Sequence, residues 1–226
     1  MFVFRDSREG DASRTRVDVA FTDASLDLRE QRPDAIAQVE AVAGVPFARL
    51  VQVHGDDVVL VTAPTGHDDV PTADAAVTTT PGLGLMVRVA DCVPVLLADP
   101  DRGVLGAVHA GRSGMVLDVA TRAVERMRDL GAEHLVGWVG PHVCGACYEV
   151  PEGMREEVAA LVPEARAQTS WGTPALDVGA GVRAQLERAG VEVVEVGGCT
   201  REREDLHSYR RDGHRSGRFA GLVWAS

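Results

Sequence analysis

Apolar residues recur at helical spacing in four segments of the chain, with acidic residues at the start and glycine at the end as boundary signals. Helices are therefore predicted over Pro33 to Ala43, Met115 to Leu130, Gly153 to Leu161 and Val178 to Ala189.

Shorter apolar runs rich in β-branched residues lie between these segments and are typical of strands. The predicted strands are Val17 to Thr22, Arg49 to Val53, Asp57 to Thr62, Ala75 to Thr79, Leu85 to Val89, Val93 to Ala98, Val104 to Val108, Leu135 to Val139, Val191 to Val196 and Gly221 to Trp224. The strands follow one another in runs, whereas a doubly wound sheet would alternate strand and helix strictly. The pattern therefore favours an α+β layered architecture.

The 226 residues contain no internal repeat, low-complexity tract or Pro/Ser-rich linker, so we expect one domain over residues 1–226. Hydrophobic residues make up 45% of the chain, which is enough for a substantial core. No apolar run approaches the roughly 20 residues of a membrane span, and the start of the chain is too polar for a signal peptide. These features predict a cytoplasmic protein that binds no membrane.

The formal net charge of −11 disfavours nucleic acid as a partner, although a local arginine cluster could still hold a small anion. The chain contains no lysine, which excludes Schiff-base catalysis, pyridoxal phosphate attachment and a P-loop lysine. It also lacks the G-x-G-x-x-G and G-x-S-x-G motifs. The four cysteines are expected to be thiols or metal ligands rather than disulfides.

Three residues with nitrogen or sulfur donors stand at the ends of predicted strands: His54 in "LVQVHG", Cys92 in "ADCVP" and His109 in "GAVHAGRSG". Zinc prefers such donors, and three protein ligands leave a fourth position for water, as catalytic sites require. No two of the three are close in sequence. The spacing alone therefore leaves two possibilities open, a zinc site or ordinary core residues.

Cys144 and Cys147 in "VCGAC" have the C-x-x-C spacing of a zinc knuckle or a redox pair. A second C-x-x-C or a pair of histidines is missing, which argues against a structural zinc site there. The zinc deaminase signature is absent too, because Val143 stands where it needs proline and no H-x-E occurs. No H-x-H pair offers ligands for a multicopper cluster.

The motifs "QVHG", "ADAAVT", "ADCVPVLL", "GAVHAG", "GP…CYEV", "GGCT" and "SYRRDG…SGR" occur in this order between about Ser25 and Val223. In this respect the chain resembles the YfiH-type laccase-domain family, also called the purine nucleoside phosphorylase or polyphenol oxidase family. The resemblance implies a four-layer α/β/β/α fold with mixed sheets. It also implies zinc held by His54, Cys92 and His109, and activity on purine nucleosides.

The implied reactions are phosphorolysis of adenosine, inosine and guanosine, with methylthioadenosine as a further substrate, and deamination of adenosine to inosine. Arg210, Arg211 and Arg218 in the tail could hold the phosphate. The tail is expected to fold over the metal cleft as an extended segment, so that only one of Arg210 and Arg211 reaches the substrate. An open zinc position would activate water for deamination.

Asp74 and Asp91 are candidates for proton transfer or for a hydrogen bond to a ligand histidine, and Tyr148 for stacking on or hydrogen bonding to a base. A capped strand end or a packed ring is the alternative for each. The expected partners are a purine nucleoside and phosphate, and the expected assembly is a monomer or a weak homo-oligomer.

The chain departs from the family pattern at several positions. Arg112 and Ser113 replace the usual tryptophan and arginine after "HAG", Ala146 and Cys147 replace a cysteine pair, and Asp27 replaces the asparagine of S-L-N-L. These changes concern substrate preference more than the metal.

Two other functions remain open at this point, a copper-dependent polyphenol oxidase and a hydrolase that edits a peptidoglycan precursor. The lack of H-x-H pairs counts against the oxidase. Nothing in the sequence separates the nucleoside enzyme from the hydrolase, because both need a polar cleft that contains a metal.

Overall fold

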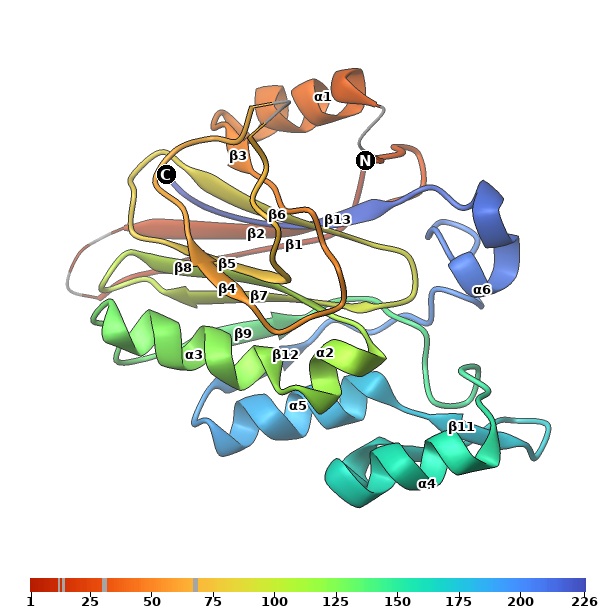
Figure 1. Cartoon of the computed structure of the whole chain (residues 1–226). Coiled ribbons are helices and arrows are strands. Elements are labelled where there is room, and N and C mark those ends of the chain that lie inside the picture. The colour runs from red at the N-terminus through yellow and green to blue at the C-terminus, as the bar shows by residue number, and fades with distance from the viewer. Residues whose placement is uncertain (12, 14, 30–31, 67–68) are drawn as a thin grey trace.

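Two mixed β-sheets lie face to face between layers of helices (Figure 1). The computed structural model describes residues 1–226 except 12, 14, 30–31 and 67–68. This arrangement is the four-layer α/β/β/α fold that the family resemblance implies, and the α+β class predicted from the strand pattern is confirmed.

The five-stranded sheet is antiparallel except for its last pair, which is parallel. Its strands, in spatial order, are β1 (Phe2–Glu9), β2 (Arg16–Thr22), β13 (Phe219–Ala225), β6 (Gly84–Val89) and β3 (Phe47–Ala48).

The six-stranded sheet has antiparallel pairs at its centre and a parallel pair at each edge. Its strands, in spatial order, are β12 (Glu192–Glu195), β9 (Val136–Val139), β7 (Val93–Asp99), β8 (Val104–Ala110), β5 (Ala75–Thr78) and β4 (Val58–Leu60). A separate hairpin joins β10 (Arg166–Gln168) to β11 (Pro174–Leu176).

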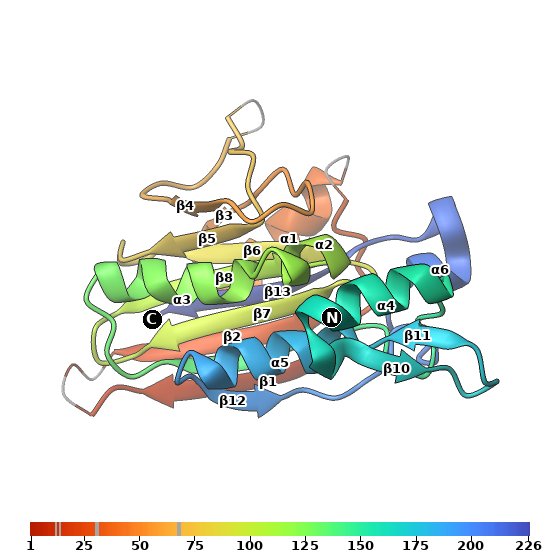
Figure 2. The same cartoon turned by 60° about the horizontal axis from the view of Figure 1, so that its bottom comes forward.

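Helices cover the outer faces of both sheets (Figure 2). Helices α3 (Val119–Asp129) and α5 (Val178–Arg188) pack on the six-stranded sheet, whereas α1 (Pro33–Ala43) packs on the five-stranded sheet. The remaining helices are α2 (Arg112–Val116), α4 (Glu152–Leu161), α6 (Tyr209–Asp212) and the 3₁₀ turns η1 (Pro163–Ala165) and η2 (Gly213–Arg215).

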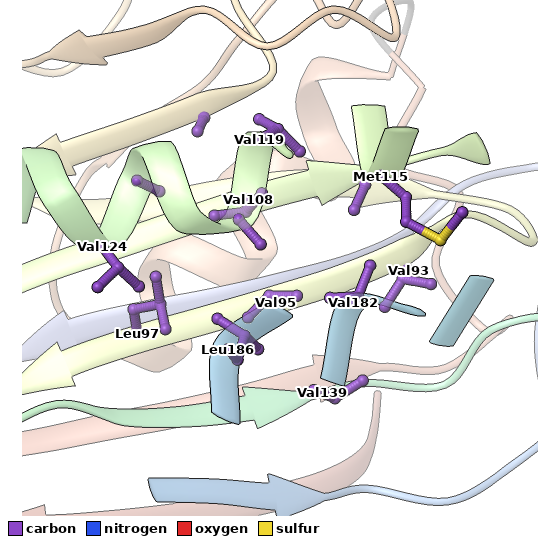
Figure 3. Close-up of a cluster of buried hydrophobic side chains, with 14 of the residues drawn as sticks. Val93, Val95, Leu97, Val108, Met115, Val119, Val124, Val139, Val182 and Leu186 are labelled. Atoms are coloured by element: carbon purple, nitrogen blue, oxygen red, sulfur yellow. The ribbon is translucent and has the colours of Figure 1, made fainter. Parts of the chain in front are cut away.

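Strand β7 shows why the central strands are continuous apolar runs. Val95 and Leu97 point into the cluster formed with α3 and α5 (Figure 3), whereas Leu96 and Ala98 point into the core between the two sheets. Successive side chains of a strand face opposite sides, so a strand covered on both faces must be apolar at every position. All seven residues of β7 are buried.

Several predicted boundaries are wrong. The helix predicted over Met115 to Leu130 is broken between α2 and α3, because Asp118 has a left-handed backbone with φ 62° that no continuous helix contains. The strand predicted over Arg49 to Val53 is replaced by the two-residue β3 and an isolated bridge at Val51.

The pattern also missed strands β1, β10 and β11, which are polar or very short. Among the described residues, no helix combines the length and apolar character needed to cross a membrane.

Candidate metal centre and substrate cavity

Residues 53–55, in the loop between β3 and β4, wrap around the carboxylate of Asp74. The N–H groups of Val53, His54 and Gly55 donate to its two oxygens at 3.2, 2.9 and 2.6 Å. His54 adopts a left-handed backbone with φ 64°, which a residue with a side chain adopts only when its surroundings compensate. The Asp74 carboxylate supplies that compensation, and the ring of His54 lies 4.8 Å from the ring of His109, centroid to centroid.

His109 stands near the end of β8 and is bound to the same carboxylate. Its Nδ1 lies 2.7 Å from Oδ1 of Asp74, and its backbone N–H donates to the Asp74 carbonyl at 2.8 Å. When Nδ1–H donates to a carboxylate, Nε2 carries the lone pair that a metal requires. Asp74, which has no exposed surface, therefore positions both histidines.

Cys92 lies in the connection between β6 and β7, where the chain crosses from one sheet to the other. The preceding residue, Asp91, has φ 87°, a second left-handed residue beside the site. The sulfur of Cys92 lies 3.6 Å from Nε2 of His54. One donor atom from each of His54, Cys92 and His109 lies within 4.8 Å of the others, so the structure brings the three predicted ligands together.

The charges of the site favour deprotonated sulfur. Burial alone would raise the pKa of Cys92, but its contacts with His109 and His54 lower the pKa to about 6. Burial would likewise lower the pKa of His109, but Asp74 and Cys92 raise it to about 9. The pKa of Asp74 is held below its ordinary value by His109 and the loop N–H groups, despite burial.

This donor set fits a zinc ion. A thiolate and two imidazole nitrogens are ligands that zinc prefers, and three of them leave one position open. Gly111 lets the donors approach, because a Cβ there would lie 2.6 Å from Cδ2 of His54 and 3.3 Å from the sulfur of Cys92.

The three donors open into a cavity of about 650 Å³, within the range of small-molecule sites. Four arginines from distant parts of the chain line it, namely Arg29, Arg88, Arg210 and Arg218. Its other walls are Val51, Gln52, Val89, Ala90, Asp91, Tyr148 and Tyr209. In a chain of net charge −11, this concentration of guanidinium groups makes the cavity suitable for an anion.

The tail carries helix α6, so the extended backbone expected for Arg210 and Arg211 is wrong. The two arginines nevertheless have different surroundings. Arg210 lies over the ring of Tyr148, 4.3 Å from its centroid, and donates to the Glu149 carbonyl. Arg211 turns away and donates to the carbonyls of Thr200, Arg203 and Leu206.

Asp91 makes no hydrogen bond to either histidine among the described contacts. One of its oxygens accepts from the Thr200 hydroxyl and the other from the Arg210 N–H, each at 2.6 Å. Asp74 therefore makes a hydrogen bond to His109, one of the predicted ligands, whereas Asp91 instead holds α6 against the cavity.

Arg29 and Arg88 line the cavity but were not predicted as site residues from the sequence. Arg88, four residues before Cys92, is the one charged residue of β6, and such an interruption of an apolar strand was a usable signal. Arg29 is bound by Asp27, whose carboxylate accepts from Nε of Arg29 and from the Arg218 N–H. Arg112 and Ser113, which depart from the family pattern, begin α2 and do not line the cavity.

Comparison with known proteins gives a consistent result. The family described as multi-copper polyphenol oxidoreductase laccase matches residues 5–226. A Streptomyces coelicolor protein named purine nucleoside phosphorylase is 58% identical over 187 residues, which cover 80% of this chain and 77% of that protein. A Mycobacterium tuberculosis protein of the same name is 47% identical over 196 residues, covering 83% and 77%.

Solved structures share the fold. A Neisseria meningitidis protein superimposes with a TM-score of 0.77 at 25% identity, covering 97% of this chain and 98% of that one. The YfiH protein of Bacillus licheniformis gives a TM-score of 0.80 at 22% identity, covering 96% and 98%.

Proposed function

The chain belongs to the multi-copper polyphenol oxidoreductase laccase family, and from this membership we propose that it is a zinc-dependent purine nucleoside phosphorylase that also deaminates adenosine. The observation that carries the proposal is the meeting of two kinds of group in one cavity. His54, Cys92 and His109 offer metal ligands, and four arginines offer an anion site beside them.

In phosphorolysis, a phosphate oxygen forms a bond to C1′ of the ribose while the bond from C1′ to the purine nitrogen breaks. The purine leaves with the bonding electrons and takes up a proton, and the sugar leaves as ribose 1-phosphate. Guanidinium groups suit this step because their planar N–H donors bind phosphate oxygens in pairs. Arg29, Arg210 and Arg218 are the proposed phosphate contacts.

The apolar side of the cavity would hold the base. Val51, Val89 and Tyr148 can cover the faces of a purine, and Gln52 beside them offers both donors and acceptors. The amide of Gln52 is itself bound to the backbone of Arg88 at both ends, so it keeps a fixed orientation. Asp74 and Asp91 act in this scheme as positioning residues.

A zinc ion at His54, Cys92 and His109 would supply a Lewis acid and a water of lowered pKa for deamination of adenosine to inosine and ammonia. The chain's own contribution is the geometry. Asp74 holds the two histidines, and the crossing between the sheets holds Cys92.

The test is to incubate the purified protein with adenosine, inosine or guanosine, with and without phosphate, and to quantify the products by chromatography. Free base and ribose 1-phosphate that form only with phosphate, and inosine that forms from adenosine without it, would support the proposal. Oxygen uptake with a phenol, bound copper and no nucleoside turnover would instead identify a polyphenol oxidase and overturn it.

A further inference from the structure

A second group of metal-ligating side chains lies outside the substrate cavity. It consists of Cys144, Cys147, Cys199 and Glu202, which we call the three-cysteine cluster. One donor atom from each lies within 4.8 Å of the others, although the sequence separates the two halves by more than fifty residues. None of the four lines the cavity, and all three sulfurs are free thiols.

The cluster is built from two tight turns of the same kind. The N–H of Cys147 donates to the Cys144 carbonyl at 2.9 Å, and the N–H of Glu202 donates to the Cys199 carbonyl at 3.1 Å. Each turn therefore presents two donor side chains three residues apart, the spacing of a zinc knuckle.

The two turns face each other directly. The backbone N–H of Cys144 points at the sulfur of Cys199 at 3.5 Å, and the thiol of Cys147 donates to Oε1 of Glu202 at 3.4 Å. A bridge between His142, which precedes the first turn, and Cys199, which begins the second turn, joins the two segments. The sequence argued against zinc at Cys144 and Cys147 because a second pair was missing, and the fold supplies that pair as Cys199 and Glu202.

The arrangement matches the needs of a closed structural site. Four protein donors complete a tetrahedron, and with zinc–sulfur bonds of about 2.3 Å the donor atoms of such a site lie about 4 Å apart. Three thiolates select a soft or borderline ion over magnesium or calcium, which take oxygen ligands. Cys147 is buried, whereas Glu202 is exposed and leaves the ion a path from solvent. We propose that the three-cysteine cluster binds a second zinc ion, structural rather than catalytic.

Such an ion would brace one wall of the cavity. Tyr148, which lines the cavity, directly follows Cys147, and Arg201 ties the two turns together by donating to the Cys147 carbonyl at 3.2 Å. Thr200, inside the second turn, binds Asp91 through its hydroxyl. The site thus fixes the position of the wall without touching the substrate.

The proposal is tested by zinc content after reconstitution with zinc alone and removal of excess metal. The wild-type chain should hold two equivalents, and Cys92→Ser and Cys199→Ser one equivalent each. In cobalt-substituted protein, Cys92→Ser should keep the strong near-ultraviolet absorption of a centre with several thiolates, whereas Cys199→Ser should keep the weaker band of one thiolate. Adding a chelator to the Cys92→Ser protein should lower its melting temperature below the value measured with zinc in the three-cysteine cluster.

Glu202→Gln provides a test that does not depend on replacing a buried cysteine. It should weaken zinc binding in the Cys92→Ser background at least tenfold, whereas Glu204→Gln, an equal charge change at a nearby exposed position, should leave it unaltered. Three results would overturn the proposal: a Cys92→Ser chain that binds no zinc, equal affinities in the two glutamine variants, or a disulfide within the cluster in freshly purified protein.

Discussion

Each predicted ligand of the candidate catalytic metal site is held in position by a few neighbouring atoms. Cys92 is the clearest case, because serine nearly matches its shape but is a poor zinc donor at neutral pH. We expect Cys92→Ser to lose the zinc of this site and to reduce nucleoside turnover at least about a hundredfold. Metal content, melting temperature and product formation should be measured on one preparation. A serine variant that keeps this zinc and its turnover would show that Cys92 is no ligand.

Gly111 tests the same site without changing a ligand. In Gly111→Ala the new Cβ would lie 2.6 Å from the exposed ring of His54, which must shift from its present position beside Cys92. We expect weaker zinc binding with little loss of stability. Gly153→Ala is the matched control: nothing lies within 4 Å of its Cβ, and alanine in α4 should stabilise the fold by about 0.5–1 kcal/mol. Equal zinc affinities in the two variants, determined by competition with a chelator, would contradict this geometry.

Asp27 links stability to pH. Burial would raise its pKa, but hydrogen bonds from the Arg29 side chain and from the N–H groups of Arg29 and Arg218 hold the pKa below the ordinary 3.8. A carboxyl group with a lowered folded-state pKa stabilises the fold above its unfolded pKa and loses this effect as the pH falls through the folded value. Asp27→Asn should therefore lower the melting temperature at pH 7, and the difference from wild type should shrink below about pH 4.

The control for this pH experiment is Glu125→Gln, which removes one charge from the exposed face of α3. Its melting temperature should differ from that of wild type by a small and nearly constant amount over the same pH range. A constant difference for Asp27→Asn as well would show that its carboxylate does not contribute through these hydrogen bonds.

Helix α6 places two adjacent arginines in different environments. Arg210 lines the cavity, whereas Arg211 binds three backbone carbonyls that would lose their partner in Arg211→Ala. We expect Arg210→Ala to raise the KM for phosphate about tenfold or more with little change in melting temperature. Arg211→Ala should lower the melting temperature with little change in the KM for phosphate. If both variants showed the same change in KM and the same change in melting temperature, the two arginines of α6 would not have separate roles.

At the scale of the whole molecule, the core between the two sheets holds in place the connection between β6 and β7, which carries Cys92. Leu96 has no exposed surface there, so Leu96→Ala should reduce the free energy of unfolding by about 2–5 kcal/mol. Leu161→Ala, in which the replaced leucine is 68% exposed, should change it by less than about 0.5 kcal/mol. Denaturant unfolding measures both. Below its melting temperature the Leu96 variant should keep its zinc.

Local patterns in the sequence determined the class of fold and much of the candidate chemistry. Strands such as β7 and β8 are apolar at consecutive positions because both faces of the sheet are covered, and this property is visible in the sequence itself. The absence of lysine excluded whole classes of enzyme on chemical grounds alone. Resemblance to a family, rather than spacing, singled out His54, Cys92 and His109 as a set.

Only the tertiary structure decided which side chains meet. The break at Asp118 depends on a backbone angle that residue type does not encode, and the separate roles of Arg210 and Arg211 depend on what surrounds α6. Asp74 acts on both histidines, and Cys199 and Glu202 lie beside Cys144 and Cys147, because the packing of strands and loops brings together residues that are far apart in the chain. Periodicity reports contacts within a few residues, whereas these contacts arise from how the sheets pack, and no short stretch of sequence contains that information.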